Sequence, residues 1–150
     1  SMKLEFYNIN EDSIRALAAL PALESFELIE CDVPAAVLAP LKQWSRLRSL
    51  TLECHNLHGD SLDVVTELKE LRQLHLRSAS LDDDDLKRIC QMKSLESLEL
   101  NAAHITAAGL EHLNELPRLN HCGVIGRLTS SPALLKIQKT RPDFSIKVLH

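Results

Sequence analysis

An LxxLxL pattern that returns at one fixed spacing constrains this chain more than any other feature. Each copy begins 24 residues after the one before it, without insertion or deletion, at Leu23, Leu47, Leu71, Leu95 and Leu119. The same register continues to Ile146 and Val148 in one direction and to Met2 and Leu4 in the other. A gap-free period of this length predicts one small unit stacked on itself many times.

Within each unit, apolar residues first alternate with polar ones and then recur every three positions. The alternation predicts a strand that is buried on one face, and the later spacing places apolar side chains on one face of a helix. The helical columns are Ile14, Leu38, Leu62, Leu86, Leu110 and Leu134, then Leu17, Leu41, Val65, Ile89, Leu113 and Ile137. Trp44 falls in a third apolar column and is expected in the core. Each unit is therefore predicted to be a strand, a turn, a helix and a return.

A polar column ahead of the helical positions predicts where the helices begin. Its members are Asn10, His58, Asp82, Thr106 and Ser130. All but His58 are residues whose side chains cap helix N-termini. Pro34 occupies the column in the second unit, where we expect a different start. The run from Asp82 to Asp85 lies on such a turn, so we predict capping carboxylates and not a calcium loop, whose ligand spacing is absent.

A single strand and helix cannot bury their apolar faces alone, but stacked units bury one another's. We therefore predict one domain over residues 1–150, made of about six 24-residue repeats. The fold class is α/β, with about seven parallel strands spaced by about 4.8 Å. Strands on the concave face and helices on the convex face make a right-handed α/β horseshoe fragment.

The unit over residues 95–118, LESLELNAAHITAAGLEHLNELPR, resembles the leucine-rich-repeat superfamily. It is most similar to the bacterial-type and ribonuclease-inhibitor-like repeats, which read LxxLxLxxTxITDAGLxxL. The resemblance implies a protein-recognition scaffold, such as a substrate-binding arm of a ubiquitin ligase or a secreted bacterial effector. One column departs from the family, in which Asn, Thr or Cys satisfies backbone groups at the strand end. That column here holds Tyr7, Cys31, His55, Ala79, Ala103 and Arg127, so no continuous side-chain ladder is expected.

The two ends of the array carry different expectations. The last unit, ALLKIQKTRPDFSIKVLH, resembles the closing segment of such arrays, so His150 is expected at or near a natural C-terminus. Met2 already occupies a core column, which predicts an unpaired edge at the first strand. Either the natural protein extends upstream, making this chain its C-terminal part, or a partner or second copy covers the edge.

Charge and cysteine usage narrow the partners and the compartment. The formal net charge is −4, and no Lys/Arg cluster has the density of a phosphate-binding surface, so nucleic acid is not expected. No run of 18 apolar residues or leader pattern is present, so no membrane span or membrane partner is expected. Four widely spaced cysteines predict reduced thiols in a cytoplasmic, intracellular protein. The family resemblance leaves a secreted effector as the alternative.

The outward strand positions are where we expect function, because packing does not need them. Three rows of these positions give a basic centre flanked by acidic side chains. The candidate partner-binding residues are Arg48, Arg72, His75, Arg77, Glu27, Glu53, Glu96, Glu99 and Asn101. Arginine there predicts docking of an acidic or mixed-charge partner. The alternative is that Glu and Arg on neighbouring strands neutralise one another on a solvated sheet. A smoother, more apolar second candidate is Gly123, Ile125, Gly126 and Leu149.

No pattern of catalysis, metal binding or cofactor binding is found. Cys31 and His55 share one predicted inward column, but their spacing fits no zinc module, and Cys54 is expected to face away from both. A nucleophile elbow, a phosphate loop and an HExxH helix are all missing. We therefore expect a non-catalytic protein-interaction module without cofactors, used as a recognition arm or adaptor. The alternative is an assembly subunit that associates through the edge of its first strand.

Overall fold

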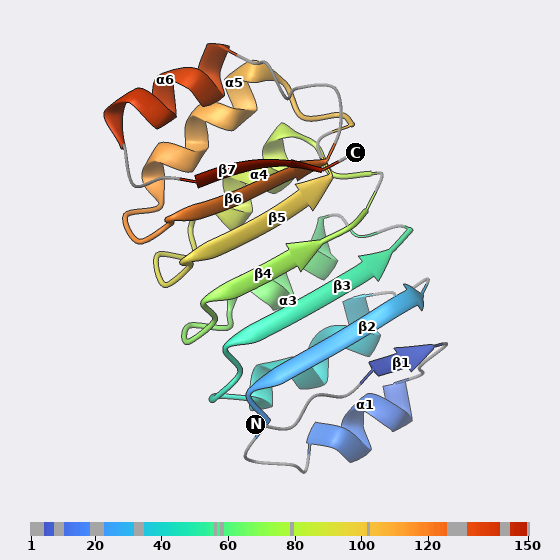
Figure 1. The fold of residues 1–150 in the computed structure, drawn as a ribbon. Helices are drawn as coiled ribbons and strands as arrows, with labels where there is room; N and C mark the ends of the chain where they lie inside the picture. The colour runs from blue at the N-terminus through green and yellow to red at the C-terminus, as the bar shows by residue number, and fades with distance from the viewer. Residues whose placement is uncertain are drawn as a thin grey trace.

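Strands and helices alternate along the chain, and every strand joins one parallel sheet (Figure 1). The structure is a computed structural model that describes residues 5–7, 11–18, 23–31, 35–55, 57, 59–78, 80–101, 103–125, 132–141 and 145–149. The strands are β1 (Glu5–Tyr7), β2 (Ser25–Cys31), β3 (Ser49–Cys54), β4 (Gln73–Leu76), β5 (Ser97–Asn101), β6 (His121–Ile125) and β7 (Ser145–Leu149). They lie in chain order, so the predicted α/β fold with a parallel sheet is confirmed.

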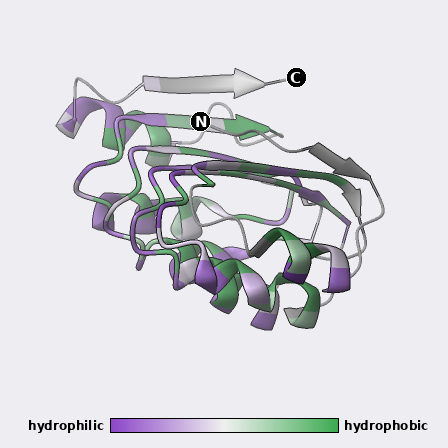
Figure 2. Ribbon diagram, turned by 90° about the horizontal axis from the view of Figure 1, so that it is seen from below, coloured by the Kyte–Doolittle hydropathy of each residue, from purple (hydrophilic) through white to green (hydrophobic). Residues whose placement is uncertain are grey.

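The helices form a second layer on one side of the sheet (Figure 2). They are α1 (Glu11–Ala18), α2 (Ala35–Leu38), α3 (Asp60–Thr66), α4 (Asp83–Ile89), α5 (Ala107–Leu110) and α6 (Pro132–Thr140), with 3₁₀ turns η1 (Ala39–Gln43) and η2 (Glu111–Glu115). None of the helices in the described part of the chain is long and apolar enough to cross a membrane.

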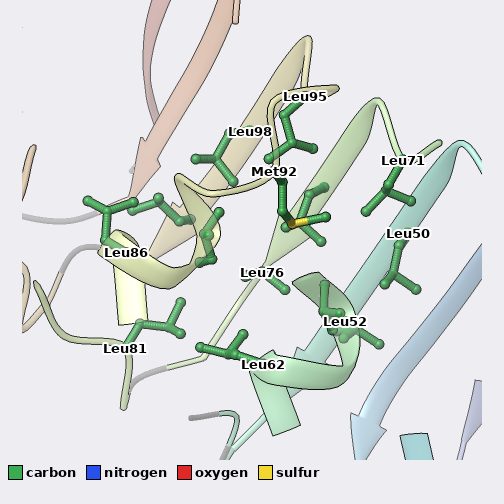
Figure 3. Packing of buried hydrophobic residues seen from close by; sticks show 14 of the residues in the cluster. Leu50, Leu52, Leu62, Leu71, Leu76, Leu81, Leu86, Met92, Leu95 and Leu98 are labelled. Carbon is green, nitrogen blue, oxygen red and sulfur yellow. The ribbon is translucent and has the colours of Figure 1, made fainter. Parts of the chain in front are cut away.

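The core fills the space between the two layers. Strand residues such as Leu76 and Leu98 point toward helix residues such as Leu62 and Leu86 (Figure 3). The first predicted helical column is buried along its whole length, from Ile14 to Leu134. Each fully buried leucine stabilises the fold by about 1.5–3 kcal/mol relative to exposure. The predicted helix faces are therefore confirmed.

Trp44 is buried as predicted and closes one end of the core. Its ring lies 4.8 Å from that of Phe26, centroid to centroid, at an interplanar angle of 60°. Its indole Nε1 is buried and has no hydrogen-bond acceptor among the described residues. Aromatic packing therefore holds this side chain in place.

The sheet register reproduces the 24-residue period between β2 and β7, pairing Leu50 with Leu74 and Leu74 with Leu98. The first strand differs from the prediction. Glu5 lies opposite Glu27, where the period placed Lys3, so this first offset is 22 residues. A shift of two residues keeps every side chain on its original face. Alternation in the sequence therefore cannot distinguish the two registers.

A bulge in β2 changes a second prediction. The register shifts between Ile29 and Cys31, so that Cys31 lies opposite Cys54 and not opposite His55. Cys54 is buried and His55 is exposed, so the expected inward pairing of Cys31 with His55 is wrong. A bulge places one extra residue in one strand and moves the following residues out of step.

Two predicted helix caps are confirmed and one is displaced. Asp82 caps α4 by accepting a hydrogen bond from the Asp85 amide at 3.0 Å, and Thr106 caps α5 through the Gly109 amide. At α3 the cap position belongs to Gly59, with φ of 54°, and not to His58. Glycine adopts this left-handed backbone without strain. Asn10, Pro34 and Ser130 lie outside the described residues.

The acidic run links three consecutive units. Asp85 is buried, and its Oδ1 accepts from the Gly59 amide of the preceding unit at 3.1 Å. Asp83 accepts from the Thr106 amide and hydroxyl of the following unit at 2.7 and 2.6 Å. Gly109 permits this approach, because a Cβ there would lie 2.0 Å from Asp83 Oδ1. These carboxylates therefore join units as well as cap a helix.

Serines satisfy backbone groups where the chain leaves β4. Ser78 is buried, and its hydroxyl lies 3.3 Å from both the Leu57 amide and the His55 carbonyl. Ser80 Oγ lies 2.9 Å from Ser78 Oγ and donates to the Leu57 carbonyl. The predicted ladder column holds Ala79, so the polar side chains flank that column instead of occupying it.

Cys90 and Cys122 are buried thiols of the core. Burial raises the pKa of each from 9.0 to about 12, because the thiolate would lose its hydration. Both therefore remain protonated and unreactive at neutral pH.

The Asp83 contact predicts a sign change in a double-mutant cycle. Gly109→Ala should destabilise the wild-type chain, because the new methyl displaces the Asp83 carboxylate from Thr106. In an Asp83→Ala background the same change should be stabilising, since alanine favours helix by about 0.5–1 kcal/mol over glycine. Urea denaturation of the four proteins should give a coupling energy of about 1–3 kcal/mol. Additive effects would contradict the contact.

The thiols predict a loss of stability in alkali. Above pH 9 the unfolded chain releases thiol protons that the folded chain retains up to about pH 12. The free energy of unfolding should therefore fall as the pH rises through this window. Denaturation at several pH values should show a shallower fall for the Cys90→Ala/Cys122→Ala variant than for wild type. Equal slopes would show that the thiols do not contribute.

Candidate functional site

The face of the sheet that points away from the helices presents ordered rows of polar side chains. We call it the open face and define it by four rows that run across the strands. The rows are Glu24, Arg48, Arg72, Glu96 and Asn120; Ser25, Ser49, Gln73, Ser97, His121 and Ser145; Glu27, Thr51, His75, Glu99 and Gly123; and Ile29, Glu53, Arg77, Asn101 and Ile125. All nine predicted partner-binding residues belong to these rows.

The predicted basic centre is largely neutralised by its own sheet. Arg72 Nη1 lies 3.2 Å from Glu96 Oε1, and Arg77 Nη1 lies 2.7 Å from Glu53 Oε1. Each pair joins neighbouring strands, as the alternative interpretation of the sequence expected. Such exposed pairs contribute about 0–1 kcal/mol to stability, so they position side chains more than they hold the fold.

Arg48 differs from the other two arginines of the open face. Its side chain is exposed and forms no ion pair with any residue in the described ranges. It lies next to Arg72 in the same row, because the Arg72 amide donates to the Arg48 carbonyl at 2.9 Å. Among the described residues, Arg48 therefore has a guanidinium without an ion pair, just before β3.

Glu99 lies between two histidines. Its Oε2 is 3.9 Å from His75 Nδ1, and its Oε1 is 3.8 Å from His121 Nε2. Both distances exceed that of a direct hydrogen bond. The Glu99 side chain is 16% exposed, compared with 37% for Glu96 and 27% for Glu53. Glu99 is therefore the most buried of the three carboxylates that have cationic or imidazole neighbours here.

Gly123 makes room for Glu99. It occupies the next position of the same row, on β6, where a Cβ would lie 2.7 Å from Glu99 Cγ. With no side chain at this position, the Glu99 side chain can extend over the β6 backbone. This brings the carboxylate within reach of His121.

Asn101 has a structural task at the end of β5. Its Oδ1 accepts a hydrogen bond from the Ala103 amide at 3.0 Å, which closes a local turn. It remains half-buried on the open face. The second candidate surface reduces to Gly123 and Ile125, since Gly126 and the Leu149 side chain lie outside what the structure describes.

The sequence interpretation missed the row of short polar residues that contains His121. The signal was present, because His121 precedes Gly123 by two residues and must face the same side of the sheet. Four of its members are serines, on strands β2, β3, β5 and β7. This row lowers the surface between the longer charged side chains on either side.

Within the described ranges, no group of three or more His, Cys, Asp or Glu side chains is placed to hold a metal ion. One hollow of about 200 Å³ lies beside the return turns, where Trp44, Leu47 and Glu67 contribute to its lining. It is separate from the four rows of the open face. The arrangement on the open face is suited to noncovalent recognition by charge and hydrogen bonding.

A scan against models of known protein families gives no match for this chain, and a search of curated proteins gives none. We therefore infer the function from the sheet and its exposed side chains. These side chains form regular rows, in which some charges are paired across neighbouring strands.

The ion pairs predict that the open face can be altered without unfolding the protein. Arg72→Ala and Arg77→Ala should each lower the free energy of unfolding by less than about 1 kcal/mol. Leu74→Ala, in the core two residues after Arg72, should cost about 2–5 kcal/mol and serves as the positive control. Urea denaturation measures all three. A loss above about 2 kcal/mol in either arginine variant would give these pairs a structural role.

Proposed function

We propose that the chain is a leucine-rich-repeat solenoid that binds a protein partner through its open face. In this proposal it is a non-catalytic recognition arm or adaptor. The observation that carries the proposal is the division of the sheet into two faces with different tasks. Leucines on one face pack against the helices, whereas the opposite face holds charged side chains that the fold does not need.

The sheet register supports the repeat assignment. Equivalent residues lie opposite one another from β2 to β7, and the buried columns recur with the same period. Stacked repeats of this kind present extended surfaces whose residues can vary without disturbing the core. A horseshoe curvature with the open face on its concave side would follow from the wider helical layer.

The ordered charges support a protein as the ligand. Arg72 and Arg77 are held by glutamates, so their guanidinium groups lose less conformational freedom on binding. Arginine is also the charged residue most often found at binding hot spots. Arg48, which has no ion pair among the described residues, and the serine row add donors and acceptors beside them.

Site-specific photo-cross-linking tests the proposal. A benzoylphenylalanine at Gln73, which is exposed in the middle of the open face, should cross-link one discrete protein from a lysate of the source cells. The same group at the exposed Gln138 of α6 is the control on the helical layer. Excess unmodified chain should abolish the adduct. Equal adducts from both positions, or none from Gln73, would contradict the proposal.

Charge reversal provides a matched second test. Arg72→Glu/Arg77→Glu should reduce capture of that partner by about tenfold or more. Arg88→Glu is the control, because Arg88 is similarly exposed and also forms an ion pair, 2.6 Å from Asp63, on the helical layer. An equal loss in the Arg88 variant would mean that net charge, and not the open face, governs capture.

Assembly through an edge strand is the alternative function. β1 lies at one edge of the sheet and pairs only with β2 among the described strands. An unpaired edge can add a strand from another chain. Light scattering at several concentrations distinguishes the two, since a mass that stays at 16.8 kDa rules out self-association.

A further inference from the structure

The carboxylates in the middle of the open face have different neighbours. Glu53 and Glu96 each meet an arginine on a neighbouring strand. Glu99 instead meets two histidines, at 3.8 and 3.9 Å. A neutral imidazole does not cancel a carboxylate charge, and no Lys or Arg among the described side chains forms an ion pair with Glu99.

The position of Glu99 makes its carboxylate accessible to a ligand. The same position makes it unfavourable for the carboxylate to lack a cationic partner. The side chain is only 16% exposed, so it has lost much of its hydration. The row continues at Gly123, over which the Glu99 side chain extends because that position has no side chain. A cation that reaches this carboxylate therefore restores interactions that water supplies only in part.

We propose that Glu99, between His75 and His121 and beside Gly123, is the acceptor site for a lysine or arginine side chain of the protein partner. The proposal rests on the proposed function and names the chemistry of the partner. Of the acidic and mixed-charge partners expected for Arg72 and Arg77, it favours the mixed-charge one, with a basic side chain at Glu99. The net charge of −4 also favours a basic group on the partner.

Other charged groups surround the site. Arg72 and Arg77 flank β4, the strand that holds His75, and Glu96 lies just before β5, the strand that holds Glu99. Lys147 lies opposite Gly123 in the register of β7.

A peptide titration tests the acceptor site. The probe is acetyl-Gly-Ser-Arg-Ser-Gly-amide, and the control is the same peptide with neutral citrulline in place of arginine. Backbone amide spectra at low ionic strength should show saturable shifts around His75, Glu99 and Gly123 with the arginine peptide alone. Glu99→Gln should weaken binding by about tenfold or more. Glu111→Gln, which removes an exposed carboxylate on the helical side, should leave it nearly unchanged.

One further variant makes the test specific. Gly123→Ala should weaken binding, because the new methyl pushes the Glu99 side chain from its position. The amide spectra report at once whether each variant is folded.

Equal shifts with the arginine and citrulline peptides, or full binding by the Glu99→Gln variant, would overturn the acceptor site. That failure would leave the cross-link from Gln73 intact, so the proposed function would stand with a partner of other chemistry. Conversely, the arginine peptide could bind at Glu99 while no protein is cross-linked from Gln73. That result would contradict the proposed function and would leave the acceptor site at Glu99 standing.

Discussion

Burial of leucine between successive units is the interaction on which the rest of this structure depends. No single strand and helix encloses its own apolar face, so each unit is stable only against its neighbours. Backbone pairing then fixes equivalent residues opposite one another, as Leu50, Leu74 and Leu98 show. This pairing also sets the arrangement of the open face, because side chains 24 residues apart in sequence become adjacent in space.

Polar contacts between units refine this stack at its turns. Asp83 and Asp85 bind the following and the preceding unit, respectively. At the opposite end of the strands, Lys93 donates to the Cys90 and Glu115 carbonyls, and the Arg141 guanidinium donates to the Leu116 and Leu119 carbonyls. These bonds satisfy backbone groups that would otherwise depend on water. The side chains of the open face therefore contribute little to the stability of the fold, except through local contacts such as that of Asn101.

The sequence predicts what periodicity controls and misses what depends on local geometry. Helix faces and sheet faces follow from spacing alone, and six of the nine candidate residues alternate with buried strand residues as expected: Glu27, Glu53, His75, Arg77, Glu99 and Asn101. Arg48, Arg72 and Glu96 lie just before their strands. The two-residue shift of β1 preserves the alternation of buried and exposed residues, so the alternation cannot reveal it. The bulge before Cys31 interrupts the alternation, and nothing in the composition marks its position. The sequence left two interpretations of the charged rows open, because rotamers decide which side chains pair. The reach of Glu99 toward His121 depends on the absence of a side chain at Gly123.

The central claim is that the open face, and not the helical layer, meets the partner. Carbodiimide labelling of carboxylates with and without the captured partner tests it most directly. The account predicts that labelling of Glu53, Glu96 and Glu99 falls in the complex, while the exposed Glu67 and Glu111 of the helical side react as before. Protection of Glu67 and Glu111 with unchanged labelling of the open face would contradict it.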